Sequence, residues 1–589
     1  MKLEEFVPLV GNFGRYQLFV VVYACMLCIV CSMVSFGNVF FAAETDHWCQ
    51  VLPQENCSSW VEFQDNCTDV KKSILLPPPE NENSKYPYST CQQWDLPPGY
   101  EFDPYEPLSE VDNHTYGQVP CQDGWEYDRS QYKTTTISDF DLVCDKRSLP
   151  SLAQAIYFAG FLVGSFVCGS LSDWIGRKKA VFVGVLFFAV GSIVTTFSVN
   201  IYMYTAFRFI AGLGNIGSFI ALYVLEMEFV GKSWRTPVTM AMGIFGALGY
   251  LFLATAAMYV RQWRTLSLII SLSTLIFFFP LVFIQESVSW LVSKGMIDEA
   301  EVVIRKVAKI NKKTLPDVLF DKEDIREDMK MKESRALPSV IDLFKTPNMA
   351  VKTINMMFNW MVTSLIYYGL SQSTGDLGVD EYWAFFISGA VEIPALLYAT
   401  VGVEWFGRKW NTAVLELIGG VACLATIFIP LGIWRTVVSM AGKFCISATF
   451  GTIYLYTAEL FPTPIRSIGL GMSSLAARIG GILSPIILLL GDYLESLPLI
   501  VFGSSAVLAG FLVLLLPETK GRKLPQTLEE GEEIGKFRCM RRNVDTVANH
   551  KLGEIQTVEE GALALSNLAF DSKAVEDEDI KKVPGNDQI

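Results

Sequence analysis

Histidine is nearly absent from this chain, with only His47, His114 and His550 among 589 residues. None of the three belongs to a group with metal-ligand spacing, and the sequence has no nucleotide-binding or nucleophile motif. Charged residues are also few, at 18%, and the net charge of −14 argues against a nucleic-acid partner. These shortages exclude the common enzyme classes, so we expect a protein that is not an enzyme and needs no cofactor.

Apolar residues, in contrast, make up 51% of the chain, and the mean hydropathy is +0.33. They form twelve long runs, each near the ~20 residues that a helix needs to cross a bilayer. The first run is too long for the apolar core of a signal peptide, and no clean cleavage site follows it. The sequence therefore predicts an all-α membrane protein with twelve transmembrane helices. The runs cover residues 17–42, 149–171, 180–198, 201–224, 237–260, 265–284, 350–371, 382–402, 411–431, 435–458, 467–490 and 496–516.

A long polar loop, residues 43–148, separates the first two runs and holds six of the thirteen cysteines and three glycosylation sequons. An even set of cysteines beside sequons is typical of an oxidising, extracellular domain. The alternative is a set of free cytosolic cysteines beside chance sequons. Six cysteines allow many pairings, among which the sequence does not choose. The predicted disulfide cysteines are Cys49, Cys57, Cys67, Cys91, Cys121 and Cys144, and the predicted glycosylated residues are Asn56, Asn66 and Asn113.

An extracellular 43–148 loop places both termini in the cytoplasm, and the distribution of basic residues agrees with this. Arg and Lys concentrate in the loops that this topology assigns to the cytoplasm, as the positive-inside rule requires. Examples are Arg177, Lys178 and Lys179, and the pair Arg408 and Lys409. We therefore expect a multi-pass protein of the plasma membrane whose surroundings are the lipid bilayer.

The sequence repeats itself at an offset of about 231 residues. GSLSDWIGRKKA (169–180) is similar to TVGVEWFGRKWN (400–411), EFVGKSWR (228–235) to ELFPTPIR (459–466), and QES (285–287) to PET (517–519). Such a six-plus-six duplication is typical of a transporter whose substrate site lies at mid-membrane between two halves.

The predicted organisation follows from the runs and the repeat. The tail is acidic with few aromatic residues, which predicts disorder, and its end, Asp587-Gln588-Ile589, is a candidate peptide for a PDZ-type scaffold or a chance ending. The segments are a cytoplasmic N-terminus with the first helix (1–42), the extracellular loop (43–148), the rest of the first half (149–284), a cytoplasmic helical linker (285–349), the second half (350–516) and the cytoplasmic tail (517–589).

Charged residues recur at the cytoplasmic ends of the repeated spans. A carboxylate at the end of a span, glycines for close packing and an arginine reaching the opposite half would latch the cytoplasmic side in one state. The alternative is a solvated charged turn. The candidate gate residues are Asp173, Arg177, Glu228, Arg235, Glu404, Arg408, Glu459 and Arg466.

Two cations, Lys443 and Arg478, lie inside predicted spans, where a charge costs about 2.5–3.5 kcal/mol on insertion scales. Other residues in the predicted spans, some of them at helical spacing on one face, add aromatic rings and one carboxylate. Together with the two cations they form a candidate substrate site. Rings and a carboxylate suit a quaternary ammonium, while arginine binds a carboxylate bidentately and lysine adds a point charge. The whole set is Arg478, Lys443, Glu392, Tyr367, Tyr368, Trp360, Tyr454, Phe450 and Ser447, with Thr363 or Ser364 on the same face as Tyr367.

Each of these assignments has a structural alternative. The aromatic residues also suit ordinary helix packing, Glu392 suits an internal salt bridge to Lys443 or Arg478, and Arg478 suits a structural pair. Arg208 precedes Gly212, Gly214 and Gly217, which favour close helix packing. It is a candidate for pairing with a carboxylate or for ion coupling, and sodium coupling, proton coupling and facilitated exchange all stay open.

The motif Gly169-x-x-x-Asp173-x-x-Gly176-Arg177-Lys178, together with its weaker repeat at 400–411, resembles the signature of the major facilitator superfamily. The cysteine-rich first outer loop, QESVSWL (285–291), YTAELFPTPIR (456–466) and LPETKG (516–521) resemble the family of organic cation, organic anion and carnitine carriers. The chain departs from the family pattern at Gln285, Ser289 and Glu404. The resemblance implies the major facilitator fold, a small organic substrate and alternating access.

The resemblance also bears on the substrate. Cation carriers of this family have aspartate where this chain has Arg478, whereas anion and carnitine carriers have arginine there, and Lys443 is similar to a lysine of the same carriers. The resemblance therefore implies a polyspecific carrier of zwitterionic or cationic solutes such as carnitine. The alternatives are an organic anion exchanger and a non-transporting receptor or scaffold that uses the outer loop.

Overall fold

The computed structural model describes residues 6–50, 76–78, 88–95, 117–316, 319 and 339–535. Within them, each of the twelve predicted spans coincides with a helix. The first half contains α2 (Arg15–Phe36), α7 (Leu149–Ile175), α8 (Arg177–Thr196), α9 (Ile201–Phe229), α10 (Arg235–Tyr259) and α11 (Trp263–Ser273), which a 3₁₀ turn (Thr274–Phe277) joins to α12 (Phe278–Leu281). The second half contains α16 (Pro347–Gln372), α17 (Glu381–Phe406), α18 (Arg408–Thr426), α19 (Ile433–Leu460), α20 (Arg466–Leu488) and α21 (Leu497–Val513).

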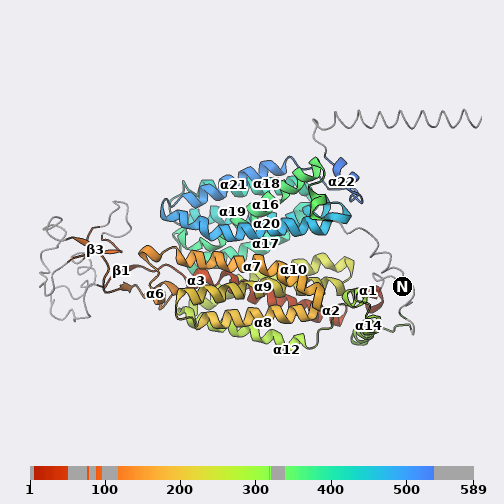
Figure 1. The fold of residues 1–589 in the computed structure, drawn as a ribbon. Helices are drawn as coiled ribbons and strands as arrows, with labels where there is room; N and C mark the ends of the chain where they lie inside the picture. The colour runs from red at the N-terminus through yellow and green to blue at the C-terminus, as the bar shows by residue number, and fades with distance from the viewer. Residues whose placement is uncertain are drawn as a thin grey trace, which may run out of the picture.

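The two halves lie as two layers of roughly parallel helices (Figure 1). The contacts between them run along α10 with α17 and along α7 with α20. By length and hydropathy, nine helices of the described residues qualify as membrane spans, while α21 is shorter and apolar, and α16 and α18 are long but more polar. The predicted all-α, two-half fold is therefore confirmed.

Small residues explain how closely the helices of the first half approach one another. A side chain added at Gly212 would meet the backbone of Tyr157, and one added at Gly214 would meet the backbone of Phe188. The glycines after Arg208 thus permit the close packing of α9 against α7 and α8, as the sequence predicts.

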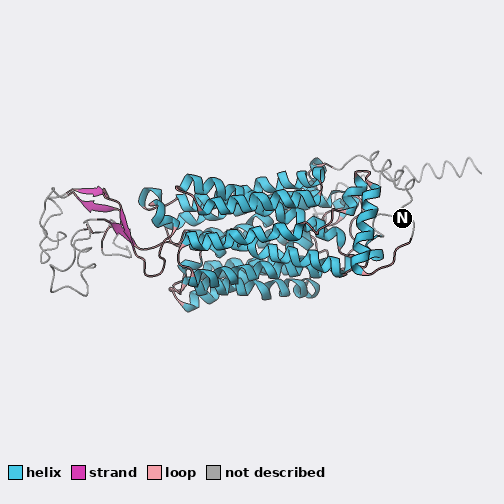
Figure 2. Cartoon of the chain, turned by 90° about the horizontal axis from the view of Figure 1, so that it is seen from below, coloured by secondary structure: helices cyan, strands magenta, loops and turns pink. Residues whose placement is uncertain are grey.

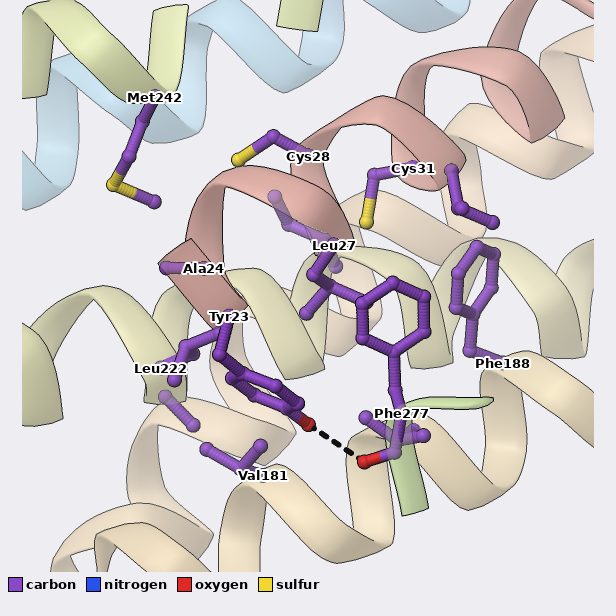
Figure 3. Packing of buried hydrophobic residues seen from close by; sticks show 14 of the residues in the cluster. Tyr23, Ala24, Leu27, Cys28, Cys31, Val181, Phe188, Leu222, Met242 and Phe277 are labelled. Atoms are coloured by element: carbon purple, nitrogen blue, oxygen red, sulfur yellow. Dashed lines mark hydrogen bonds between the residues drawn. The ribbon is translucent and has the colours of Figure 1, made fainter. Parts of the chain in front are cut away.

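The core of the first half forms where α2 meets α8, α9 and the broken sixth span (Figure 3). There Tyr23 donates a hydrogen bond of 3.0 Å to the carbonyl oxygen of Phe277. The sixth span changes to a 3₁₀ turn at Thr274, whose hydroxyl donates to the carbonyl of Ser271 at 2.6 Å. Ser/Thr back-bonding of this kind bends helices, and it provides a local reason for the break.

A small β-structured domain extends from one end of the helices, opposite the N-terminus (Figure 2). It pairs β1 (His47–Cys49) with β4 (Trp125–Tyr127) and β2 (Gln92–Trp94) with β3 (Gln118–Pro120), both antiparallel. Disulfides join Cys49 to Cys121 and Cys91 to Cys144, which resolves the pairing for four of the six predicted cysteines. Because Cys91 and Cys144 are bonded to each other, their closeness to His47 does not make a metal site.

The remaining described elements are short and flank the spans: α1 (Phe6–Val10), α3 (Asn38–Phe41), α6 (Thr136–Phe140), α13 (Val288–Ser293), α14 (Ile297–Asn311) and α22 (Leu528–Glu533). All six described cysteines outside the loop are free. Several predicted features lie outside the described residues: Asn56, Asn66, Asn113, Cys57, Cys67 and the terminal Asp587-Gln588-Ile589.

The prediction of a disordered tail is wrong for residues 517–535. Helix α22 docks on the N-terminus of α16, where the carboxylate of Glu532 accepts hydrogen bonds from the hydroxyl of Thr346 at 2.6 Å and the backbone N–H of Met349 at 3.0 Å. The ammonium group of Lys352 donates to the carbonyl of Gly531 at 2.8 Å. A carboxylate at the positive end of the α16 dipole is favourable, and composition does not reveal this docking.

Candidate functional site

Lys443 and Glu392 form a buried ion pair near mid-membrane. The Lys443 Nζ lies 2.9 Å from a Glu392 oxygen, and the two side chains are 1% and 7% exposed. The ammonium also donates to the Ser371 hydroxyl and lies 4.0 Å from the ring centroid of Tyr367. The internal salt bridge that the sequence leaves open is therefore formed, so these two charges neutralise each other.

Aromatic side chains from both halves surround this pair. The Tyr367 hydroxyl donates to the second Glu392 oxygen at 3.1 Å, and the Tyr250 hydroxyl of α10 lies 2.9 Å from that of Tyr367. Phe36 of α2 stacks on Tyr368 with ring centroids 5.9 Å apart, and Phe158 of α7 contacts Tyr368 at 4.5 Å. The predicted pair Tyr367 and Tyr368 thus lies on the boundary between the halves.

Arg478 of α20 differs from Lys443 in having no carboxylate partner within the described residues. Its side chain is half-buried, and its Nε has no hydrogen-bond partner. The guanidinium carbon lies 6.0 Å from the ring centroid of Phe161 and is near enough to Tyr368 and Tyr454 to interact with them electrostatically. The described part of the site therefore carries one net positive charge, and that charge is on Arg478.

The other predicted site residues divide between the boundary and the interior of the second half. Tyr454 is 45% exposed and contacts Phe450 with ring centroids 5.9 Å apart, so both belong to the boundary. Trp360, in contrast, is 1% exposed and donates from Nε1 to the Thr457 hydroxyl at 2.9 Å. Trp360 lies behind Tyr454, with ring centroids 4.3 Å apart, and its indole N–H is satisfied inside the bundle, so its role in binding stays a prediction.

Three hydroxyls predicted near the site are also buried. Thr363 donates to Glu416 at 3.0 Å, Ser364 donates to the carbonyl of Ala477 at 2.7 Å, and Ser447 is 4% exposed. Thr363 and Ser364 therefore join helices, which is the structural alternative to a substrate contact.

Arg208 is fully buried in the first half, and its partners are neutral. Its guanidinium donates to the carbonyl of Val34 at 2.9 Å and to the side-chain oxygen of Gln154 at 2.5 Å. It also lies 4.2 Å from the ring centroid of Tyr157. Of the options that the sequence left open, pairing with a carboxylate is not formed among the described residues, and a role in ion coupling stays a prediction.

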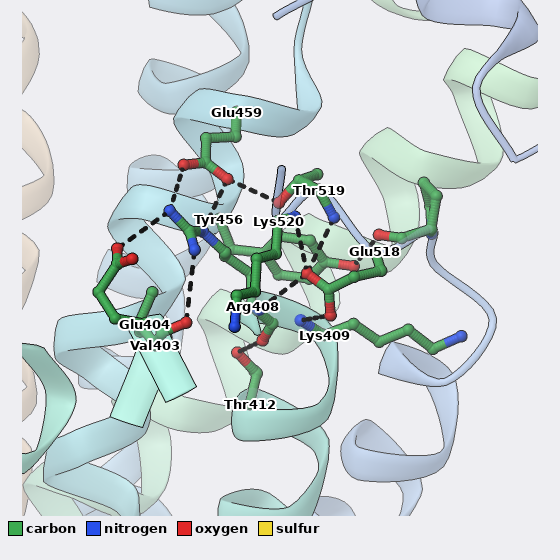
Figure 4. Close-up of polar contacts among 11 residues, drawn as sticks. Val403, Glu404, Arg408, Lys409, Thr412, Tyr456, Glu459, Glu518, Thr519 and Lys520 are labelled. Atoms are coloured by element: carbon green, nitrogen blue, oxygen red, sulfur yellow. Dashed lines mark hydrogen bonds and ion pairs between the residues drawn. The ribbon is translucent and has the colours of Figure 1, made fainter. Parts of the chain in front are cut away.

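A charge cluster joins the start of α18 to the end of α19 (Figure 4). Arg408 binds Glu459 through two hydrogen bonds of 2.9 and 3.0 Å and lies 3.4 Å from Glu404. The carboxylate of Glu518 accepts hydrogen bonds from the backbone N–H groups of Arg408 and Lys409 at 2.9 and 3.1 Å. Burial raises the pKa of Glu518, but these bonds and those from Thr519 and Lys520 outweigh it and lower that pKa below its usual value.

The first half repeats this cluster with equivalent residues. Arg177 lies 2.9 Å from Asp173 and 3.4 Å from Glu228, and Glu286 accepts from the backbone N–H of Arg177 at 2.8 Å. The turn that carries each arginine begins with a glycine at positive φ, Gly176 at 106° and Gly407 at 84°. An added side chain there would also collide with the carboxylate of Glu286 or Glu518, so glycine is required at both turns.

The expectation that these arginines reach the opposite half is wrong for this structure, because Arg177 and Arg408 each pair within their own half. Arg466 donates to the carbonyl of Phe461 at 3.4 Å and lies outside its cluster. Arg235 is exposed and forms no ion pair with the described residues. The role of the two clusters as a gate stays a prediction.

Polar contacts cross between the halves at more than one level: besides that of Tyr250 with Tyr367, the Thr400 hydroxyl donates to the Met240 sulfur at 3.5 Å, and two more lie near the β-structured end. The Tyr132 hydroxyl donates to Glu381 at 2.6 Å, and Arg147 lies 3.1 Å from Asp492. Burial raises the pKa of Asp492, although Arg147 opposes this shift.

Sequence reasoning missed several residues of the boundary. Tyr250 and Phe36 lie in runs without charge or motif, so no local signal distinguishes them from packing residues. Glu286 and Glu518 belong to the repeated QES and PET motifs, and that repetition was a signal of their equivalent roles.

We expect the two cytoplasmic clusters to differ in strength. Arg408→Gln removes two hydrogen bonds to Glu459, each worth about 1.5–3 kcal/mol for a charged group, and lowers the stability more than Arg177→Gln does. Thermal unfolding of both variants in detergent, followed by tryptophan fluorescence, measures the difference. Equal destabilisation would contradict the ranking.

Comparison with known proteins agrees with this geometry. A model of the sugar (and other) transporter family matches residues 112–530. The chain is 35% identical over 543 residues to the organic cation transporter protein of Drosophila melanogaster, covering 91% of this chain and 95% of that one. It is 33% identical over 533 residues to organic cation/carnitine transporter 2 of Homo sapiens, covering 90% of this chain and 93% of that one.

The xylose transporter XylE from E. coli, in a partially occluded inward-open conformation, shares the fold with a TM-score of 0.55 at 14% identity, over 87% of this chain and 100% of XylE. At that identity the likeness extends to the fold alone. The chain belongs to the organic cation/carnitine transporter family, solute carrier family 22 of the major facilitator superfamily, and it is a multi-pass membrane transporter rather than an enzyme.

Proposed function

We propose that this protein is a plasma-membrane carrier of zwitterionic organic solutes such as carnitine, and that it works by alternating access. The observation that carries the proposal is Arg478, a cation without a carboxylate partner among the described residues, on a boundary lined with aromatic rings. The similarity to a carnitine transporter supports the same substrate class.

The carboxylate of the substrate is assigned to Arg478. Its guanidinium offers a planar fork of donors, and its Nε has no protein partner, so a carboxylate can bind bidentately. Binding there neutralises the one net charge of the site, which favours a ligand with a carboxylate over a simple cation.

The ammonium end is assigned to the aromatic surface of Tyr454, which is exposed, and of the half-buried Tyr368 and Phe450. Cation–π attraction to such rings contributes about 0.5–2 kcal/mol, with the larger value where water is excluded. Glu392 contributes only indirectly in this scheme, because Lys443 and Tyr367 occupy its oxygens.

One observation favours a second candidate, an organic anion exchanger. Since Glu392 is neutralised by Lys443, no free carboxylate remains in the described site for a substrate cation. An aromatic carboxylate would satisfy Arg478 and stack on the same rings without any cationic group.

Uptake of labelled carnitine and of labelled benzoate, each with and without sodium, separates the two candidates. We expect carnitine uptake to exceed benzoate uptake in cells whose surface expression has been verified by biotinylation. The reverse order identifies the anion exchanger, and no uptake of either contradicts the zwitterion proposal and leaves the receptor or scaffold alternative. Comparison of uptake with and without sodium shows whether transport is coupled to sodium.

Two further assignments belong to this proposal. The Arg177 and Arg408 clusters are assigned to gating, since motion of each half against the other changes the surroundings of both cytoplasmic ends. The contacts Tyr132–Glu381 and Arg147–Asp492 are assigned to the closed outer side. Both assignments assume that the β-structured loop is extracellular.

A further inference from the structure

A small internal cavity lies beside Arg208, away from the substrate boundary. It has about 10 Å³ of room for the centre of a water-sized sphere, which is room for a single small species of about the size of a water. It is lined by Val34, Phe41, Ser192, Thr195, Arg208, Ala211, Ser267, Ile270 and Ser271, all of them at least nine-tenths buried.

Two donors that line this cavity have no hydrogen-bond partner. The Arg208 Nε is unpaired although the side chain is 1% exposed, and the Ser192 hydroxyl is unpaired at 4% exposed. Buried donors without partners are rare in native proteins, because each costs the desolvation of a polar group. Their presence around one cavity indicates a bound species that accepts hydrogen bonds.

The charge of the site distinguishes an anion from a water. Arg208 binds only the Val34 carbonyl, the Gln154 amide and the Tyr157 ring, and no carboxylate of the described residues lies within ion-pair distance. An uncompensated cation in a buried position is strongly unfavourable. A water would satisfy the two donors but would leave that charge uncompensated.

The surrounding hydroxyls suit a small anion. Thr195 donates to the carbonyl of Gly191 and Ser267 pairs with Thr196, so these two are already engaged. Ser192 is the lining hydroxyl without a hydrogen-bond partner in the described residues, and the Ser271 side chain also lines the cavity. The volume excludes polyatomic anions such as carboxylates or phosphate.

We propose that this cavity is a structural site for a halide-type monoatomic anion such as chloride, held by Arg208, Ser192 and Ser271 between α2, α8, α9 and α11. The anion compensates the buried guanidinium and so stabilises the first half. This site is separate from the substrate boundary, and it does not depend on which solute the protein carries.

The test uses the full-length protein in detergent, in the Arg478→Gln background, so that halide binding at the other unpaired cation does not contribute. We expect the thermal midpoint to rise with chloride or bromide against gluconate at constant ionic strength, since a ligand that binds only the folded state stabilises it. Gluconate is too large for the cavity. An unchanged midpoint over the whole titration overturns the proposal.

Matched serine variants locate the site. Ser192→Ala and Ser271→Ala each weaken the apparent halide affinity by about tenfold, as expected for the loss of one hydrogen bond to a charged group. Ser273→Ala is the control, because Ser273 is on the same helix but donates to the carbonyl of Ile270 and does not line the cavity. An equal halide effect in all three variants overturns the assignment.

A direct readout completes the test. Crystals grown in bromide give an anomalous peak beside Arg208 if the anion is present. Density there without an anomalous peak identifies a water and overturns the proposal.

Discussion

Arg478→Gln reduces uptake of carboxylate-bearing substrates by at least about 30-fold while surface expression is kept. Removing one partner of a buried, hydrogen-bonded charge pair costs about 2–5 kcal/mol, and Arg478 is the cation to which the carboxylate is assigned. Glutamine retains donors and size but loses the charge and the fork. Initial uptake rates of labelled carnitine, normalised to surface protein, measure the effect.

Two further variants make the result specific. Arg478→Lys keeps the charge and loses the bidentate geometry, so we expect uptake between those of the wild type and Arg478→Gln. Arg466→Gln is the control, because Arg466 lies on the same helix and binds only the Phe461 carbonyl and the Thr463 hydroxyl at its end. Normal uptake by Arg478→Gln would contradict the assignment of the carboxylate to Arg478.

Separating Lys443 from Glu392 is expected to have the largest effect on stability. Removing one partner of a buried salt bridge costs about 3–5 kcal/mol, because the other charge stays buried and uncompensated. Lys443→Met and Glu392→Gln should therefore each lower the thermal midpoint strongly in detergent. Lys443→Met should be the more severe, since Lys443 in Glu392→Gln keeps its contacts with Ser371 and the Tyr367 ring.

The double variant Lys443→Met/Glu392→Gln tests whether the pair acts as one unit. We expect it to recover much of the stability lost in either single variant, because no unpaired charge remains. It should also retain part of the uptake, since Arg478 still binds the carboxylate. Additive destabilisation in the double variant would show that the two residues act independently.

Much of the fold was predictable because a membrane imposes strong rules on sequence. A span must be long and apolar, so the twelve runs and the twelve helices agree. The repeat offset also predicted the paired turns, and Gly176 and Gly407 both have a positive φ with a carboxylate against each. The break in the sixth span and the docking of α22 were not predictable, since they depend on local hydrogen bonds.

The sequence named candidate residues for the site, but it did not predict which of their charges pair with one another. The sequence singled out Lys443, Glu392, Tyr367 and Arg478 as site candidates, and the structure brings the first three into direct contact while Arg478 lies near Phe161. Which cation pairs with Glu392 depends on the distances between α16, α17, α19 and α20. The spacing of residues along one helix gives no information about these distances.

The sequence by itself determined where charged residues, glycines and long apolar runs occur along the chain. These positions predict the fold, the duplication and the candidate residues. Only the tertiary structure decided that Lys443 is neutralised, that Arg478 and Arg208 have no carboxylate partner among the described residues, and that Arg177 and Arg408 pair within their own halves. The physical reason is that a charge in a low-dielectric interior is controlled by partners a few ångströms away. Those partners come from helices that are distant in sequence.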